Sequence, residues 1–375
     1  MFGLKVILQV STGVFGHCTA EDTAAVTRTL EDLLRRLPVR AVIYGWGTRE
    51  GLLDRILEVT RRHGAAAWLW LPVFADVQNP ETADPMILFG TEKESFVRTC
   101  PGEAFHFICP ASARNRNQLF QAYEDLTVAG APDGVFLDRI RYPSVVRGSA
   151  YFFGCRCAVC RDRLMKAGMN PRLFMDQANW VNSLDDCLPA SMEHGRYHYS
   201  DPELERISAM KRTNITETVE QICCEFHRRG IQVGVDTFAP ALADLVGQDL
   251  NALLPMVDLI KPMMYFKTLA PAGIPCETAA YGKAFSERLS ALWGGKIDDP
   301  LSMEKQLKSL ADPKKKVCPG IEVNHIPNIC EPDIISLREA FRGIRSAGCD
   351  TVVLSWNVLQ ARGEELREVE RILAE

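Results

Sequence analysis

Along most of the 375-residue chain, short apolar runs with strand character alternate with amphipathic segments of helical spacing. The strand-like runs are Lys5–Val10, Ala41–Tyr44, Ala66–Val73, Gly134–Leu137, Gln232–Val235, Leu259–Met264, Val317–Val323 and Thr351–Ser355. The helix-like segments include Thr23–Leu37, Gly51–His63, Asn117–Ala129, Leu204–Arg229, Ile334–Ala347 and Glu364–Ala374. Such alternation implies a parallel sheet with right-handed crossovers, and about eight units close a barrel. We therefore expect an α/β fold, a (β/α)8 TIM barrel. An open, doubly wound sheet is the alternative, although no Gly-x-Gly-x-x-Gly turn follows the first run.

Two connections in this pattern are much longer than a usual βα loop. One covers residues 76–116 after the third run, and the other extends from residue 139 to about residue 201 after the fourth. On a barrel both would lie at the C-terminal face, where active sites are built. We expect a single (β/α)8 domain over residues 1–375, with extended third and fourth βα loops and a rim insertion at about 139–200.

Charge and hydropathy exclude two classes of partner. The chain has 43 basic and 48 acidic residues, a formal net charge of −5, which disfavours a general nucleic-acid binder. No apolar run approaches the roughly 20 residues of a membrane span. Residues 1–10 indicate a first strand rather than a signal peptide, because Lys5 and Gln9 interrupt the apolar run. Thirteen cysteines, an odd number, are typical of reduced thiols in a cytoplasmic protein, with a subset binding a metal.

The fourth strand-like run ends in a dense polar segment. Gly134–Leu137 is followed by a carboxylate, two arginines and a tyrosine, namely Asp138, Arg139, Arg141 and Tyr142. Pro143 then prevents further ladder pairing. A carboxylate at the C-terminal end of a buried parallel strand lies where barrels place their chemistry. The alternative is that Asp138 only forms an ion pair with a neighbouring arginine.

A Cys-x-Cys-x2-Cys cluster lies in the long fourth loop, at Cys155, Cys157 and Cys160. Three thiolates at this spacing can bind one Zn²⁺, but a tetrahedral site needs a fourth ligand. Cys109 in the third loop is the best candidate, ahead of Cys100 and Cys187, because loops three and four are neighbours on a barrel rim. Four cysteines would make a closed, structural zinc site. The alternative is free thiols without a metal.

Further polar residues lie at the ends of the other strand-like runs, including the carboxylates Asp236 and Glu322. Two carboxyl groups that flank an anomeric carbon are the requirement for glycoside hydrolysis, and aromatic faces stack on sugar rings. Asp138 and Glu322 are the preferred catalytic pair, with Asp236 third. The expected sugar-binding residues are Gln9, Trp46, Arg141, Tyr142, Lys261, Tyr265, Asn324, His325 and Trp356.

Each of these assignments has a structural alternative. Asp236 could cap a helix or pair with Lys261, and Glu322 could face an outer helix. His325 could be a surface residue, and Trp68 and Trp70 are expected to pack between the sheet and the helices.

Residues Gly134–Pro143 resemble the strand-four motif of uncharacterised TIM-barrel families described as glycoside hydrolases, and Lys261–Tyr265 resembles their strand-six motif. Separately, Cys109, Cys155, Cys157 and Cys160 are similar in order and spacing to the four-cysteine zinc site of family forty-two β-galactosidases. In the clan of those retaining enzymes, the acid/base is a glutamate after strand four and the nucleophile a glutamate ending strand seven. Glu322 matches the second position, and the first falls on Asp138. Clans with an aspartate nucleophile on strand four would instead make Asp138 the nucleophile and Asp236 or Glu322 the acid.

The resemblance and the residues together predict a cytoplasmic, zinc-stapled barrel that cleaves or transfers a glycosidic bond of a small carbohydrate or glycoside. Two other functions stay open. One is a non-catalytic carbohydrate-binding protein on a glycosidase-like barrel. The other is a metal-dependent hydrolase with ligands such as Asp138 and His325. A homo-oligomer is compatible with a barrel of this size.

Overall fold

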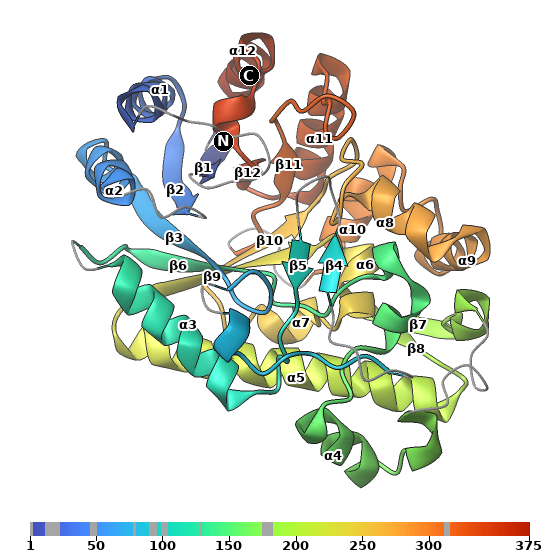
Figure 1. Cartoon of the computed structure of the whole chain (residues 1–375). Coiled ribbons are helices and arrows are strands. Elements are labelled where there is room, and N and C mark those ends of the chain that lie inside the picture. The colour runs from blue at the N-terminus through green and yellow to red at the C-terminus, as the bar shows by residue number, and fades with distance from the viewer. Residues whose placement is uncertain are drawn as a thin grey trace.

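The computed structural model describes residues 3–11, 23–45, 51–77, 80–89, 96–98, 104–127, 130–174, 183–310 and 316–375. At its centre is a closed barrel of parallel strands surrounded by helices, as the alternation predicts (Figure 1). Around the ring lie β1 (Lys5–Ser11), β2 (Val39–Gly45), β3 (Ala66–Pro72), β6 (Gly134–Asp138), β9 (Gln232–Phe238), β10 (Leu259–Met263), β11 (Gly320–Glu322) and β12 (Thr351–Ser355). β12 pairs with β1 and closes the ring. The (β/α)8 TIM barrel is thus confirmed. The seventh strand is shorter than predicted, and Val317 makes only an isolated bridge to Ile260.

Large side chains inside the barrel fill its interior. Trp68 and Trp70 of β3 belong to an interior cluster with residues of six other barrel strands or strand approaches, and they do not pack between sheet and helices as expected. Glycines on the neighbouring strands make room for them. A Cβ atom at either Gly134 or Gly234 would lie 2.7 Å from the Trp68 ring, closer than real contacts allow. The alternation along β3 is compatible with tryptophans that point into the barrel or out toward the helices. The glycines on β6 and β9 leave room inside the barrel, so the tryptophans point inward.

Amphipathic helices surround the strands, and α1 shows the pattern of burial clearly. In α1 (Thr23–Arg36), Val26, Leu30, Leu33 and Leu34 are buried, the three-to-four spacing that predicted this helix. The other helices are α2 (Leu52–Arg62), α3 (Ala113–Leu126), α4 (Ala158–Lys166), α5 (Pro202–Arg228), α6 (Pro240–Ala243), α7 (Leu250–Leu253), α8 (Ile274–Tyr281), α9 (Lys283–Trp293), α10 (Met303–Lys308), α11 (Ile334–Ala347) and α12 (Gly363–Ala374).

Side-chain caps fix where two of these helices begin. α3 starts before the predicted Asn117, because the Ser112 hydroxyl accepts the Asn115 N–H at 3.2 Å. α5 starts after Asp201, whose carboxylate accepts the N–H groups of Glu203 and Leu204. No helix in the described ranges is long and apolar enough to cross a membrane.

The two long connections carry small elements of their own. The third loop contains the hairpin β4 (Phe96–Arg98) and β5 (Ala104–His106), and the fourth contains α4 and the hairpin β7 (Ser191–Glu193) and β8 (Arg196–His198). Short 3-10 turns lie at Pro80–Thr82, Val145–Arg147, Ser149–Phe153, Pro171–Phe174, Leu184–Cys187, Asp244–Val246, Pro300–Ser302 and Val358–Gln360. These loops surround the C-terminal end of the barrel, called the barrel mouth below.

Candidate active site and thiol cluster

Three carboxylic acids lie at the barrel mouth. Asp138 is the last residue of β6, Glu322 is the last residue of β11, and Asp236 lies in β9. Because the strands are parallel, all three residues lie toward the same end of the barrel. β6 pairs directly with β9, and the last pair of the register, Leu137↔Val235, directly precedes Asp138 and Asp236. These two carboxylates therefore lie side by side on adjacent strands, with Glu322 on a strand further around the ring.

Lys261 is the hub of the barrel interior. Its ammonium group is fully buried and donates to Gln9 Oε1 at 2.8 Å, Asp236 Oδ2 at 2.9 Å and the Tyr265 hydroxyl at 2.8 Å. A lysine has three donors, so the protein uses all of them. Lys261, predicted to line the sugar pocket, is thus placed to position the groups around it.

Asp138 is partly exposed and held by two donors. Trp70 Nε1 donates to Oδ2 at 3.0 Å, and the backbone N–H of Arg139 donates to Oδ1. Burial raises the pKa of the Asp138 carboxyl, against the opposing charges of Lys261 and Arg141. The two donors fix the carboxyl group at the mouth in one orientation.

Asp236 and Glu322 both titrate near neutral pH. Burial raises the pKa of Asp236 to about 7, although the Lys261 ammonium opposes the shift, and the Asp138 charge adds to it. Burial likewise raises the pKa of Glu322 to about 7, while its Oε1 accepts the backbone N–H of Lys267. Carboxyl groups with such pKa values can hold and release a proton near neutral pH.

The Tyr265 hydroxyl is close enough to all three carboxyl groups to be affected by their charges. Burial raises the pKa of Tyr265, and the negative charges of Asp236, Glu322 and Asp138 raise it further. Glu322 is the most peripheral of the three, since it also borders a small pocket formed with Lys267, Ser336 and Leu337 next to α11.

The two arginines of the strand-four segment are also buried. Arg141 lies over the rings of Phe238 and Phe107, with its guanidinium carbon 4.6 and 5.2 Å from their centroids, and donates to the Tyr142 carbonyl. Arg139 forms an ion pair with Asp76. Both Arg139 and Asp76 have φ near 54°, a backbone region unusual for such residues and typical of functional sites.

Several buried polar atoms at the mouth have no hydrogen-bond partner within the described part of the chain. They are Gln9 Nε2, Ser11 Oγ, Asp236 Oδ1 and Asn324 Nδ2. A buried polar atom without a partner is costly unless a ligand or water satisfies it. Gln9 and Asp236 bind the same Lys261 ammonium, so a free donor and a free acceptor lie close together there.

The remaining predicted sugar-binding residues do not all lie together in the structure. Asn324 and Trp356 lie together, since Asn324 Oδ1 accepts the Trp356 N–H at 2.9 Å. His325 instead contacts Arg362 and lies 3.8 Å from Glu365 of α12, so it does not join the carboxylates. Tyr142 points toward the thiol cluster, where Asn214 Nδ2 donates to its hydroxyl at 2.7 Å. Trp46 lies outside the described residues.

The sequence did not indicate Glu277 of α8. Its side chain is fully buried, Oε1 accepts the Ala272 N–H at 2.9 Å, and burial raises its pKa while Arg141 opposes the shift. A single glutamate within a helical pattern carries no signal of burial. Its partner Arg141 was identifiable only because it follows a strand.

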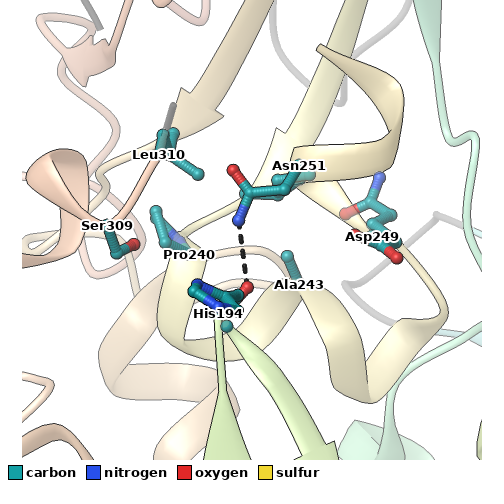
Figure 2. A pocket seen from close by; sticks show the side chains of 10 residues that line it. His194, Pro240, Ala243, Asp249, Asn251, Ser309 and Leu310 are labelled. Atoms are coloured by element: carbon teal, nitrogen blue, oxygen red, sulfur yellow. Dashed lines mark hydrogen bonds between the residues drawn. The ribbon is translucent and has the colours of Figure 1, made fainter. Parts of the chain in front are cut away.

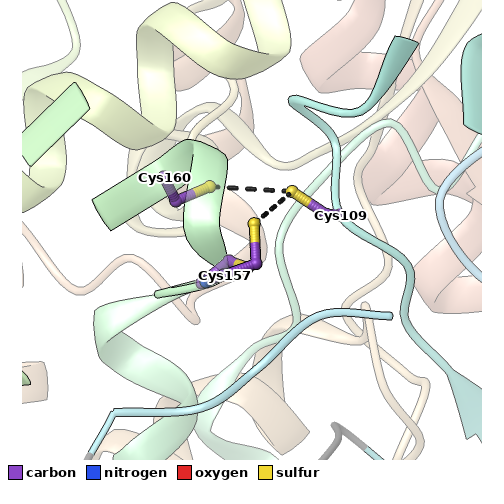
Figure 3. A group of neighbouring side chains, drawn as sticks. Cys109, Cys157 and Cys160 are labelled. Carbon is purple, nitrogen blue, oxygen red and sulfur yellow. Dashed lines mark hydrogen bonds between the residues drawn. The ribbon is translucent and has the colours of Figure 1, made fainter. Parts of the chain in front are cut away.

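The four predicted cysteines meet between the third and fourth loops. Cys109 Sγ lies 3.4 Å from Cys157 Sγ and 3.6 Å from Cys160 Sγ (Figure 3). Cys155 is the fourth member, and all four sulfur atoms lie within 4.8 Å of one another. Four thiolates about 2.3 Å from one metal ion would be about 3.8 Å apart, which these separations approach. The cluster is compatible with a metal site. Cys187 lies elsewhere and Cys100 falls outside the described residues.

Within the described ranges, this is the one group of three or more histidine, cysteine or acidic side chains close enough to hold a metal ion. Asp138 and His325 do not form such a group. A separate small pocket, lined by His194, Pro240 and Asn251 beside the β7–β8 hairpin, contains none of the three mouth carboxylates (Figure 2).

The barrel resembles glycosidase structures. The chain aligns with the PgaB (BpsB) glycoside hydrolase domain from Bordetella bronchiseptica at a TM-score of 0.63 and 15% identity, over 99% of each chain. A Group IV chitinase from Ostrinia furnacalis gives 0.50 at 10% identity, over 99% of this chain and 100% of that one. The α-L-fucosidase isoenzyme 2 from Paenibacillus thiaminolyticus gives 0.51 at 13% identity, over 100% of this chain and 49% of that one. No family model and no curated protein matches the chain. At these identities, the likeness shows the barrel fold.

Proposed function

We propose that the protein is a glycoside hydrolase-like enzyme that cleaves or transfers a glycosidic bond of a carbohydrate by carboxylate acid/base chemistry. The observation that carries this proposal is the set of three carboxyl groups, Asp138, Asp236 and Glu322, at one end of the barrel, two of them with a pKa of about 7. Cleavage needs one carboxyl group that donates a proton to the leaving oxygen and another that attacks or activates water.

The contacts favour Asp138 and Asp236 as the working pair, ahead of Asp138 and Glu322. Asp236 has one oxygen held by Lys261 and the other without a partner, and its raised pKa suits a proton donor. Asp138 accepts hydrogen bonds from two N–H groups, which stabilise its ionised form and oppose the burial that raises its pKa. Glu322 accepts the backbone N–H of Lys267 at the edge of the mouth. Its carboxylate would stabilise positive charge that develops on the bound sugar.

The sugar would contact polar atoms that the protein leaves unsatisfied. Gln9 Nε2, Asn324 Nδ2 and Asp236 Oδ1 are suited to hydroxyl groups. Trp356, which is partly exposed, and Trp46 would supply aromatic faces, and Tyr265 would line the floor between the carboxylates.

We also infer that the thiol cluster binds a structural Zn²⁺. Cys109, Cys155, Cys157 and Cys160 supply four sulfur ligands, the number and type of a closed tetrahedral zinc site. The ion would join the third and fourth loops. With all four positions taken by cysteine, it would leave no coordination position for substrate or water.

The direct test is a screen of purified protein against chromogenic and natural glycosides, including polysaccharides. Release of a sugar or aglycone from at least one class supports the proposal. Specific binding of an oligosaccharide without cleavage under any condition between pH 5 and 8 would instead indicate a carbohydrate-binding protein on this barrel.

A further inference from the structure

A stripe of buried polar side chains lies along one face of α5. Ser208, Lys211, Asn214 and Thr218 are three or four residues apart, so they share one side of the helix, and each is less than a tenth exposed. Polar residues on the buried face of a helix need partners there. Lys211 Nζ donates to the carbonyl groups of Phe152 and Leu245, and Thr218 Oγ1 donates to that of Pro110 at 2.8 Å. The stripe therefore links α5 to three loops around the barrel mouth.

Asn214 bridges two features with different roles. Its Nδ2 donates to the Tyr142 hydroxyl at 2.7 Å and to Cys160 Sγ at 3.5 Å. The orientation of the amide follows from Arg163, which donates to Asn214 Oδ1 at 2.7 Å. A guanidinium group can only donate, so Oδ1 must be the acceptor and both N–H groups point toward Tyr142 and Cys160.

Tyr142 connects this amide to the strand-four segment. It directly follows Arg141, its N–H donates to the Val246 carbonyl at 2.9 Å, and its side chain is fully buried. A shift of Tyr142 would therefore displace Arg141, whose positive charge acts on the Asp138 carboxyl group. On the other side, Cys160 is one of the four clustered thiols, and a metal-bound thiolate is a good acceptor for an N–H group.

We propose that Asn214 is a positioning residue that couples the metal bound by the four cysteines to the Asp138–Tyr142 segment at the barrel mouth. A bound ion would fix the Cys160 thiolate. Hydrogen bonds to Cys160 and Arg163 then fix the Asn214 amide, and this amide fixes the Tyr142 hydroxyl. The catalytic part of this coupling rests on the proposed glycosidase activity, and the link to Tyr142 rests on the metal site inferred above, so a wild type that binds no Co²⁺ would overturn it.

The test uses protein loaded with Co²⁺, whose thiolate absorption reports the site directly. The rate of Co²⁺ release to excess chelator is measured for wild type, Asn214→Leu, Tyr142→Phe and Ser208→Ala. Asn214→Leu should release the ion about tenfold faster, since groups that hydrogen-bond a metal ligand typically change metal affinity by this factor or more. Tyr142→Phe should release it about threefold faster, because its hydroxyl acts on the ligand only through the Asn214 amide. Ser208→Ala removes a partly buried hydrogen bond that Arg212 donates to Ser208 on the same helix, and this variant should release the ion at the wild-type rate.

Tyr142→Phe decides the proposal, because it removes one oxygen atom that does not touch the metal ligands and should fold even if Asn214→Leu does not. Wild-type release by Tyr142→Phe would overturn the coupling, as would equal acceleration by Ser208→Ala. These outcomes do not depend on glycosidase activity. Where a substrate is known, Tyr142→Phe with its metal bound should lower kcat about tenfold with little change in KM, and an unchanged kcat would overturn the catalytic part.

Discussion

The Asp236 carboxyl group has two oxygens in different environments. One accepts a hydrogen bond from the Lys261 ammonium, and the other is buried without a partner in the described part of the chain. Burial raises the pKa of this group to about 7. Asp236 is thus protonated below about pH 7 and ionised above it, which sets the pH range in which it can donate a proton.

The first prediction concerns the pH dependence of activity. If Asp236 is the proton donor, kcat/KM should fall as the pH rises above about 7, because the donor form is then lost. Asp236→Asn should lower kcat/KM by about a hundredfold or more and abolish that alkaline limb. The profile is measured between pH 5 and 9 on any cleaved substrate. If the alkaline limb persists in Asp236→Asn, another group is the proton donor.

The second prediction concerns Glu322 and the stability of the fold. Burial raises its folded pKa to about 7, so between about pH 4 and 7 the unfolded chain releases a proton that the folded chain retains. Stability from this group is present below pH 4 and is lost as the pH rises to 7, a change on the order of 3 kcal/mol. Glu322→Gln keeps an acceptor for Lys267 and carries no charge. Its Tm should therefore rise relative to wild type between pH 5 and pH 8.

Glu287→Gln provides a matched control for this experiment, since the Glu287 side chain is exposed on α9. Its Tm difference from wild type should be the same at pH 5 and pH 8. A constant difference for Glu322→Gln as well would mean that Glu322 does not titrate near neutral pH.

At the scale of elements, the thiol cluster joins two loops that the barrel alone does not hold. Cys109 follows β5 in the third loop, while Cys155, Cys157 and Cys160 lie in the fourth, around the start of α4. The small elements of these loops lie outside the barrel sheet, so a metal that bridges them would contribute to stability directly.

The third prediction follows from that bridge. Cys160→Ser should reduce bound zinc from about one per chain to none and lower Tm by about 5 °C or more, because a ligand in a closed site is lost. Zinc is measured by elemental analysis and Tm by calorimetry. Cys224→Ser, an exposed position on α5, should change neither. Equal zinc content in Cys160→Ser and wild type would refute the four-cysteine site.

Local sequence was sufficient for the eight barrel strands, for several outer helices and for three of the clustered cysteines, but not for side-chain partners. Three patterns can be read from neighbouring residues alone. They are the apolar spacing of α1, the alternation of side chains along β3 and the close spacing of Cys155, Cys157 and Cys160. Burial of Trp68 inside the barrel depends on glycines that lie 66 and 166 positions further along the chain, at Gly134 and Gly234. The Lys261 hub and Glu277 likewise depend on contacts between distant strands and helices, which no local pattern specifies.

At the scale of the whole molecule, the closed barrel brings three carboxylates to one mouth from strands distributed along most of the chain. Asp138, Asp236 and Glu322 are separated by 98 and 86 positions along the chain, and the neighbouring strands β6, β9, β10 and β11 bring them together. The opposite end of the same strand offers an internal control. Asp133, just before β6, accepts the Ala67 N–H at 2.8 Å at the N-terminal end of the barrel, where residues contribute to stability rather than chemistry.

The most direct test of the account compares release of new reducing ends from a cleavable glycan by wild type, Asp138→Asn and Asp133→Asn. Circular dichroism and Tm verify that each variant is folded. Asp138→Asn should lower kcat by about a thousandfold while Asp133→Asn stays within about twofold of wild type, because only the former removes a carboxyl group from the mouth. Wild-type turnover by folded Asp138→Asn would contradict the account.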